Sequence, residues 1–322
     1  MTNDNIATIQ RIELARDRIS SKIFSTPLVK SQSLSSHCGT PVFLKLEHHQ
    51  RTGSFKVRGA INAIQNLTKV QIKAGVVGFS TGNHGRGLAY AARAAGVRCI
   101  ICMSELVPKN KIEGIISQGA EVRIVGKTQD DAQLEVNRLV EEEGMVLIPP
   151  FDHLDIIAGQ GTLGLEIADQ LPEISAAVVP VSGGGLISGV ALALKDRIPD
   201  CRVIGVSMER GAAMFLSQKA GQPILVAEEE TLADSLGGGI GLDNKYTFKM
   251  TKELVEDIVL VSENDIAMAI RHAYWHEAQI IEGSGAVAIA ALISNKVKTK
   301  GLTVAFVCGG NIDMALHHRV IS

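Results

Sequence analysis

The chain has 322 residues, 46% of them hydrophobic, and its 32 basic and 34 acidic residues give a formal net charge of -2. A chain of this length and composition can bury a substantial core in one or two globular domains. Because it has no basic run, the sequence argues against nucleic-acid binding and against attachment to anionic membranes, and small-molecule chemistry is the expected class of function.

The N-terminal segment, residues 1–19, lacks the apolar stretch of a signal peptide, and nowhere do about 18 uncharged apolar residues follow one another. We therefore expect a cytoplasmic protein. The five cysteines are an odd number for a disulfide framework. Cys99 and Cys102 lie in one apolar run, and residues i and i+3 of a strand face opposite ways, so we do not expect a redox or metal pair there.

Short apolar runs alternate with helical patterns along the chain. The runs that predict strands span residues 42–47, 74–80, 97–103, 120–126, 176–182, 202–208 and 302–308. Residues 87–95 and 130–143 have the apolar spacing of helices. This alternation predicts an α/β fold with parallel-rich open sheets covered by helices. We expect a smaller α/β domain at about residues 47–150, inserted between residues 1–46 and 151–322, which form a larger domain.

Ligands of open α/β sheets bind at the carboxyl ends of strands, so polar segments near those ends are candidates for a site. The first, residues 51–60 (RTGSFKVRGA), places Lys56 directly after Phe55 at the start of an expected helix. Taken alone, Lys56 is a solvated helix residue and Phe55 a core residue, because most lysines are exposed and most phenylalanines are buried.

The second segment, residues 79–87 (FSTGNHGRG), ends an apolar strand with small and hydroxylated residues before an alanine-rich helix. Such a turn presents backbone N–H groups and short polar side chains to a ligand. The alternative is an ordinary capping turn, in which Ser80 or Thr81 caps the helix.

The third segment, residues 181–189 (VSGGGLISG), also lies between a strand and a helix. Gly183, Gly184 and Gly185 let the backbone approach an anion, and the positive end of the following helix points at the same place. The segment lacks the Lys-Ser/Thr ending of a nucleotide-binding loop, so it favours the phosphate of a cofactor. A merely tight turn is the alternative.

The fourth segment, residues 308–311 (CGGN), follows the last expected strand. Cys308 alone is most often a small buried hydrophobic residue, and its place at a strand end is what makes it a candidate. The glycine-rich residues 236–241 and the segment 282–286 (EGSGA) offer further ligand-facing backbone.

In this order, S-F-K-x-R-G-A, S-T-G-N-H-G, S-G-G-G-L-I-S-G, E-G-S-G-A and C-G-G-N resemble the motifs of fold-type II pyridoxal-phosphate enzymes, in the branch of threonine/serine dehydratases and serine racemases. The sister branch of cysteine synthases typically has S-V-K-D-R and S-G-N-T-G, which this sequence lacks. The resemblance covers nearly the whole chain. It implies a two-domain, tryptophan synthase β-like fold, pyridoxal 5'-phosphate as cofactor and a homodimer.

The resemblance also implies roles for individual residues. Lys56 would hold pyridoxal phosphate covalently and Phe55 would form a wall of the ring pocket. Asn83 would hydrogen-bond the 3'-oxygen, and Cys308 would face the pyridine nitrogen. The 5'-phosphate would be cradled by backbone N–H groups of Gly183, Gly184, Gly185 and Leu186. The substrate carboxylate would be bound by backbone and hydroxyl groups of Ser80, Thr81, Gly82 and His84.

The implied activity is β-elimination by an ammonia-lyase, which removes water and then ammonia from a β-hydroxy amino acid and leaves a 2-oxo acid. Lys56 would also take the α-proton, since burial lowers the pKa of a lysine. A neutral thiol at Cys308 would not keep the pyridine nitrogen protonated, which favours expulsion of the hydroxyl over transamination.

Two positions depart from the racemase pattern. Thr81 stands where racemases have a serine that handles the proton on the opposite face of the ring. Its hydroxyl can still donate, but its methyl group restricts the rotamer, so we do not expect racemisation. Glu209 matches one ligand of a divalent-cation site, whereas Phe215 occupies the place of the aspartate ligand. Hard cations need several oxygen ligands, so we expect this metal site to be weak or absent.

Residues 207–215, 231–248 and 270–275 look more specifically like hydroxyectoine-utilization dehydratases, which implies a β-hydroxylated intermediate of compatible-solute breakdown as the substrate. The sequence ends at Ser322 without room for the regulatory domain of biosynthetic threonine deaminases, so we expect no response to isoleucine. Two alternatives stay open. One is an amino-acid racemase on the same scaffold, and the other is a non-catalytic protein that binds a phosphometabolite through the glycine segment.

Overall fold

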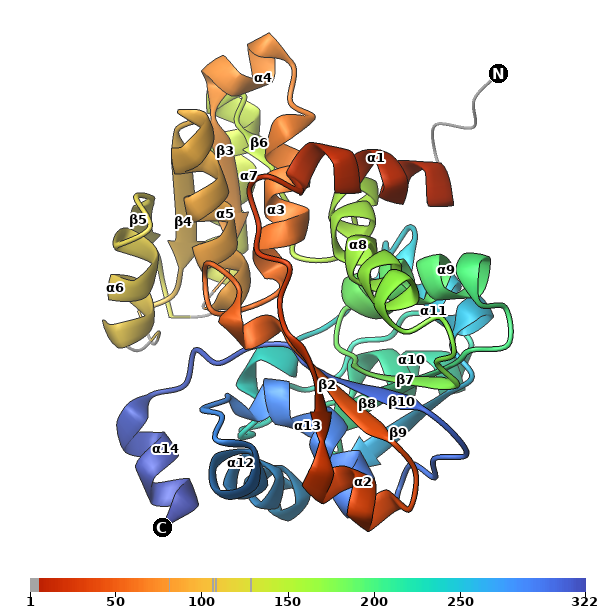
Figure 1. Ribbon diagram of the computed structural model, residues 1–322. Coiled ribbons are helices and arrows are strands. Elements are labelled where there is room, and N and C mark those ends of the chain that lie inside the picture. The colour runs from red at the N-terminus through yellow and green to blue at the C-terminus, as the bar shows by residue number, and fades with distance from the viewer. Residues whose placement is uncertain (1–5, 81, 106, 108, 128) are drawn as a thin grey trace.

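The computed structural model describes residues 6–322 except residues 81, 106, 108 and 128. Its strands form two sheets, a six-stranded one ordered β1-β2-β10-β7-β8-β9 and a four-stranded one ordered β5-β4-β3-β6 (Figure 1). The larger sheet contains β1 (Leu28–Ser31), β2 (Val42–Leu46), β7 (Ala176–Pro180), β8 (Arg202–Met208), β9 (Asp257–Val261) and β10 (Thr303–Val307). The smaller sheet contains β3 (Val76–Phe79), β4 (Cys99–Met103), β5 (Glu121–Ile124) and β6 (Val146–Leu147).

All neighbouring strands of the described residues run parallel except β1 and β2, which are antiparallel. This confirms the predicted α/β class with parallel-rich sheets. Each of the seven predicted runs contains a strand. The strands without a prediction are β1, β6 and β9, which all lie at sheet edges; β6 has only two residues, too few for a pattern.

Helices cover both sheets, as parallel strands require (Figure 1). They are α1 (Ile9–Ile19), α2 (Gln32–Cys38), α3 (Lys56–Gln65), α4 (Lys69–Ala74), α5 (Asn83–Ala95), α6 (Lys109–Ile116), α7 (Gln129–Glu143), α8 (Leu154–Gln170), α9 (Gly185–Arg197), α10 (Ala213–Ala220), α11 (Thr247–Leu254), α12 (Glu263–Glu277), α13 (Gly283–Ile293) and α14 (Met314–Ile321), with short 3-10 helices η1 (Glu47–His49) and η2 (Asp234–Leu236). The predicted helix at 87–95 begins earlier, at Asn83, so the polar residues of the second segment form its first turn.

The four strands of the smaller sheet lie within residues 76–147, and those of the larger sheet lie on either side of that range. The domain bounds at about 47 and 150 stay a prediction. Cys99 and Cys102 are both free, and they pack into different hydrophobic clusters on opposite faces of β4. The expectation that they do not form a pair is therefore supported by the alternation of side chains along the strand.

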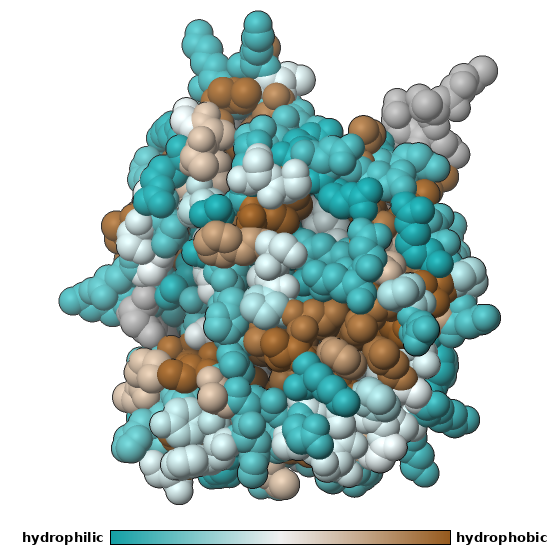
Figure 2. All heavy atoms as spheres, viewed as in Figure 1, coloured by the Kyte–Doolittle hydropathy of each residue, from teal (hydrophilic) through white to brown (hydrophobic). Residues whose placement is uncertain are grey.

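The viewed face of the molecule is mostly hydrophilic (Figure 2). A hydrophobic area interrupts it in the lower centre, near β2, β7 and β10 of Figure 1. Large exposed hydrophobic residues such as Leu14 and Val70 are otherwise scattered among polar ones. Among the described residues, no helix is both long and apolar enough to cross a membrane.

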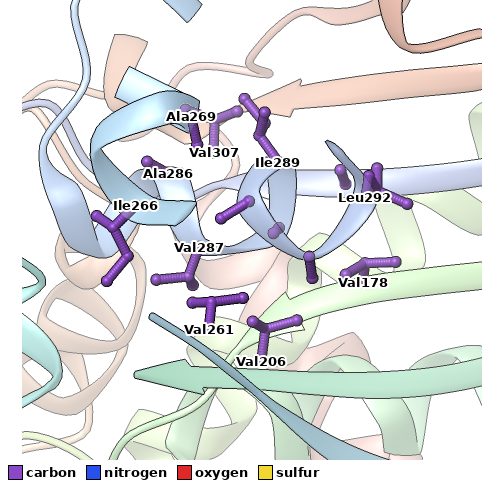
Figure 3. Close-up of a cluster of buried hydrophobic side chains, with 14 of the residues drawn as sticks. Val178, Val206, Val261, Ile266, Ala269, Ala286, Val287, Ile289, Leu292 and Val307 are labelled. Atoms are coloured by element: carbon purple, nitrogen blue, oxygen red, sulfur yellow. The ribbon is translucent and has the colours of Figure 1, made fainter. Parts of the chain in front are cut away.

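The largest part of the core lies between the six-stranded sheet and the helices α12 and α13. Val206 and Val261 of the sheet lie near Val287 of α13, while Ile289 of the same helix lies near Val307 of β10 (Figure 3). Helix α13 is buried from Gly283 to Leu292, which explains its apolar sequence on every side. This packing holds the carboxyl ends of the central strands in a fixed arrangement, and the site is built there.

Candidate active site

Three of the four sequence segments follow the strands β3, β7 and β10, and they meet at the carboxyl ends of these strands together with the start of α3. Here they line two adjoining cavities, one of which has a volume of about 330 Å³. Both cavities are lined by Lys56, Asn83, Phe151, Ser182, Gly183 and Ser235. The cavity next to the one of about 330 Å³ is further lined by Phe55, Gly184, Gly185, Leu186, Ser284 and Cys308. The structure therefore brings together the residues that the sequence proposed for a cofactor.

Lys56 is the first residue of α3, and its amine points inward rather than into solvent. The Lys56 Nζ donates a hydrogen bond to the carbonyl oxygen of Pro150 at 2.8 Å and lies 5.3 Å from the centre of the Phe55 ring. Phe55 is buried against the core of the larger sheet. Burial lowers the pKa of Lys56 to about 8, although Cys308 nearby acts in the opposite direction. The reading of Lys56 as a solvated helix residue is wrong.

The lowered pKa predicts how the apoprotein captures its cofactor at different pH. Only a neutral amine attacks an aldehyde, and with a pKa of about 8 the neutral fraction rises about tenfold per pH unit below pH 8 and then levels off. The rate of cofactor capture, followed by visible absorbance after mixing, should show the same rise and plateau. A lysine with the ordinary pKa of about 10.4 would instead give a rate that still rises at pH 9 to 10, and that result would contradict the prediction.

Asn83 is held by Glu282, which directly precedes α13, and by Asn311, which lies between β10 and α14. Its Nδ2 donates to Glu282 Oε1 at 2.6 Å, and its Oδ1 accepts from Asn311 Nδ2 at 2.6 Å. The backbone N–H of Asn311 donates to the other oxygen of Glu282 at 3.1 Å, which closes the network. Burial, assisted by Asp234, raises the pKa of Glu282 to about 7. The Asn83 amide therefore has one orientation, with its remaining hydrogen-bonding capacity free for a ligand.

The first turn of α5 has no side-chain cap, because its N-cap is Gly82. Ser80 does not cap the helix; its hydroxyl accepts from the Gly82 N–H at 3.2 Å. The N–H groups of this turn are consequently open to an anion from the cavity that Ser80, Gly82 and His84 line. Thr81, the other residue proposed here for the substrate, lies outside the described residues.

The glycine segment packs against Phe151. A Cβ at Gly183 would lie 2.2 Å from the Phe151 ring, and Gly184 has a φ of +88°, in the left-handed region. Helix α9 begins at Gly185 with no side-chain cap, so its first N–H groups are available at the cavity wall. The glycines thus satisfy the protein's own packing and also leave the helix N-terminus open to a phosphate.

Cys308 lies at the end of β10 and is joined to the lysine segment through the backbone. The Phe55 N–H donates to the Cys308 carbonyl at 3.1 Å, and Ser54 forms a β-bridge with Gly309. The Cys308 Sγ donates to the Ser284 carbonyl at 3.4 Å. Burial raises the pKa of this thiol, so it is neutral at physiological pH. The hydroxyl oxygen of Ser284 is buried in the same cavity and has no partner among the described residues.

These features fit pyridoxal phosphate. A lysine with a lowered pKa, an amide with a fixed orientation, an open helix N-terminus and an unpartnered buried hydroxyl match its aldehyde, 3'-oxygen, phosphate and ring nitrogen. Sequence reasoning missed Phe151, Glu282, Ser284 and Asn311 as individual residues. Glu282 and Ser284 belong to the E-G-S-G-A segment and Asn311 to C-G-G-N, so the signal was present, but it pointed to backbone rather than to side chains.

The place expected for a metal contains a lysine. The Lys296 Nζ lies 3.1 Å from Glu209 Oε1, 3.1 Å from Asp265 Oδ2 and 2.8 Å from the Leu260 carbonyl oxygen. Phe215 is a partly buried hydrophobic residue packed against the core of the larger sheet. No group of three or more His, Cys, Asp or Glu able to hold a metal occurs among the described residues.

This arrangement predicts that metal removal has no effect on catalysis. The Lys296 ammonium already neutralises Glu209, so a divalent cation would have to displace it. Dialysis against a chelator should leave the rate and the melting temperature unchanged. A loss of activity that added Mg²⁺ or Ca²⁺ restores would show that the metal site is retained.

The chain is similar to known proteins along nearly its whole length. The family described as pyridoxal-phosphate dependent enzyme matches residues 19–309. The chain is 57% identical to a protein of Sinorhizobium fredii over 98% of this chain and 95% of the other. It is 38% identical to the catabolic L-threonine dehydratase of Escherichia coli, over 98% of this chain and 96% of that one. The structure of maize serine racemase superimposes with a TM-score of 0.92 at 34% identity, covering 97% and 96% of the two chains.

The fold and site therefore define a pyridoxal-phosphate-dependent enzyme, and the chain belongs to that family. Within it, the chain belongs to the threonine/serine dehydratase and serine racemase branch, as its motifs predicted.

Proposed function

We propose that this enzyme removes water and then ammonia from a β-hydroxy amino acid and releases a 2-oxo acid. The observation that carries this proposal is Lys56, an amine with a pKa of about 8 at the junction of the glycine segment, Asn83 and the substrate-side cavity. The similarity to the L-threonine dehydratase of E. coli supports the same reaction class.

In this proposal, Lys56 holds pyridoxal phosphate, Phe55 packs beside the ring and Asn83 hydrogen-bonds the 3'-oxygen. Gly183, Gly184, Gly185 and Leu186 bind the phosphate through N–H groups at the start of α9. Cys308, with Ser284 beside it, faces the pyridine nitrogen. Bound pyridoxal phosphate supplies the electron sink for negative charge that develops at the substrate Cα.

The residues of the chain perform the proton transfer and the orientation. With its pKa lowered by burial to about 8, the Lys56 amine would take the α-proton of the bound substrate. The neutral Cys308 thiol would not protonate the pyridine nitrogen of the bound cofactor, which would favour expulsion of the β-hydroxyl. The N-terminus of α5, with Ser80, Gly82 and His84, binds the substrate carboxylate, and Thr81 is proposed to assist from the same segment.

The reaction is tested with the purified holoenzyme on L-threonine, L-serine and threo-3-hydroxyaspartate, with 2-oxo acid and D-amino acid measured separately. We expect 2-oxo acid and ammonia in equal amounts and no D-amino acid. The similarity to maize serine racemase makes racemisation the specific rival, and a D-amino acid as main product would establish it. A protein without visible absorbance after addition of cofactor would instead support the non-catalytic alternative.

The natural substrate is a narrower proposal. The resemblance of residues 207–215, 231–248 and 270–275 to hydroxyectoine-utilization dehydratases supports a β-hydroxylated intermediate of hydroxyectoine breakdown. It would be tested by comparing kcat/KM for such a compound with kcat/KM for L-threonine. The homodimer implied by the family also stays a prediction, to be checked by light scattering.

A further inference from the structure

We propose that the imidazole of His84 accepts a hydrogen bond from the β-hydroxyl of the substrate and thereby selects amino acids that carry a hydroxyl at Cβ. The proposal deepens the proposed dehydratase function and rests on it. It concerns the side chain of His84 and not its backbone N–H, which belongs to the first turn of α5 and is proposed to bind the carboxylate.

The tautomer of His84 follows from its one hydrogen bond. His84 Nε2 lies 2.8 Å from the carbonyl oxygen of Ile148. A carbonyl oxygen can only accept, so Nε2 carries the proton and Nδ1 presents a lone pair. Burial, together with the positive charge of Lys56, lowers the pKa of His84 to about 3. The ring is therefore neutral throughout the physiological range, and Nδ1 acts only as an acceptor.

This acceptor has no partner in the protein. His84 is 3% exposed, and its Nδ1 is buried without a hydrogen bond to any described residue. A buried polar atom is normally paired, and this one belongs to a residue of a cavity wall, so a ligand in the cavity can provide the partner. His84 lines the cavity of about 330 Å³ that Lys56 and Ser80 also line, where the substrate would lie.

The chemistry of the substrate identifies which group donates. The α-carboxylate is ionised and has no proton to give, and the α-amine is engaged with the cofactor during the reaction. The β-hydroxyl is the remaining donor that every member of the proposed substrate class carries. His84 is thus a positioning and specificity residue, distinct from the base Lys56.

The first test measures binding and needs no turnover. α-Methyl-L-serine and 2-aminoisobutyrate differ by one hydroxyl, and neither has an α-proton to lose. Calorimetry on the holoenzyme should show the hydroxyl compound binding about tenfold more tightly, as expected when its absence leaves a buried acceptor unpaired. In His84→Leu this preference should disappear, while His84→Gln, which keeps an acceptor oxygen, should retain part of it.

A matched control is available in α14. His317 is 1% exposed and has an unpartnered Nε2 among the described residues, but it does not line the cavity. His317→Leu should leave the tenfold preference intact. If His84→Leu does not fold, the wild-type preference and its partial retention in His84→Gln still decide the question.

The second test uses turnover of L-serine and β-chloro-L-alanine, which has a leaving group at Cβ but no donor. His84→Leu should lower kcat/KM for L-serine about tenfold more than for the chloro compound. Equal binding of the two inert compounds by the wild type, or equal losses for the two substrates, would overturn the proposal. A wild type that prefers the hydroxyl compound but makes no 2-oxo acid would refute the proposed function and leave the role of His84 in binding.

Discussion

Lys56→Ala is expected to abolish the visible absorbance of the bound cofactor and to lower kcat by at least the roughly 10²- to 10⁴-fold that a positioned base contributes. The loss should be larger than that, because the same amine is proposed to hold the cofactor. Both effects have one origin in the position of the amine, 2.8 Å from the Pro150 carbonyl at the wall shared by the two cavities. Absorbance spectra and a 2-oxo acid assay on the same preparation measure the two effects separately.

The chain offers a matched control for this change. Lys69 is also the first residue of a helix, α4, but it is exposed and does not line the two cavities. Lys69→Ala should leave the spectrum and kcat unchanged. A Lys56→Ala protein that still shows the cofactor band and forms 2-oxo acid would refute the assignment of Lys56.

Arg58→Met is expected to lower the free energy of unfolding by about 3–5 kcal/mol, the usual effect of removing one member of a buried ion network. Arg58 and Glu47 are fully buried and joined by two hydrogen bonds of 2.8 Å. Arg58 also bonds Glu166 at 2.6 Å, which pairs with the buried Lys45 at 2.8 Å. Methionine would leave the Glu47 carboxylate without a cation. Glu166 would keep one cationic partner, Lys45.

Urea denaturation followed by circular dichroism would measure this loss. Arg202→Met is the matched control, because Arg202 forms a similar two-point contact with Glu256 but at the surface. Its expected effect is about 0–1 kcal/mol. Equal losses in the two variants would show that burial of the Arg58 network contributes nothing particular to stability.

The fold class and the site segments were predictable because they depend on local sequence. Strands such as β4 and β10 are continuous apolar runs, and each proposed segment adjoins a run or a helix start. The edge strand β6 was not predictable, because it has only two residues and forms through pairing with the longer strand β3.

Contacts between distant residues could not be read from the sequence either. Asn83 and Glu282 are 199 positions apart, and their hydrogen bond exists because the two sheets meet at the site. The tautomer of His84 likewise depends on the carbonyl of Ile148, which the sequence does not single out. Sequence patterns therefore identified which segments form the site, whereas the protonation and orientation of each side chain required the structure.

The backbone link between Phe55 and Cys308 has a consequence for motion during the reaction cycle. The lysine segment is paired with the end of β10 by the Phe55 N–H bond and the Ser54–Gly309 bridge, so Lys56 and Cys308 move as one unit. Asn83 belongs to α5, which packs closely against the start of α3: a Cβ at Gly87 would lie 3.1 Å from the Val57 backbone nitrogen. The separation between the proposed aldehyde anchor and the proposed partner of the ring nitrogen is therefore expected to stay constant during the reaction cycle.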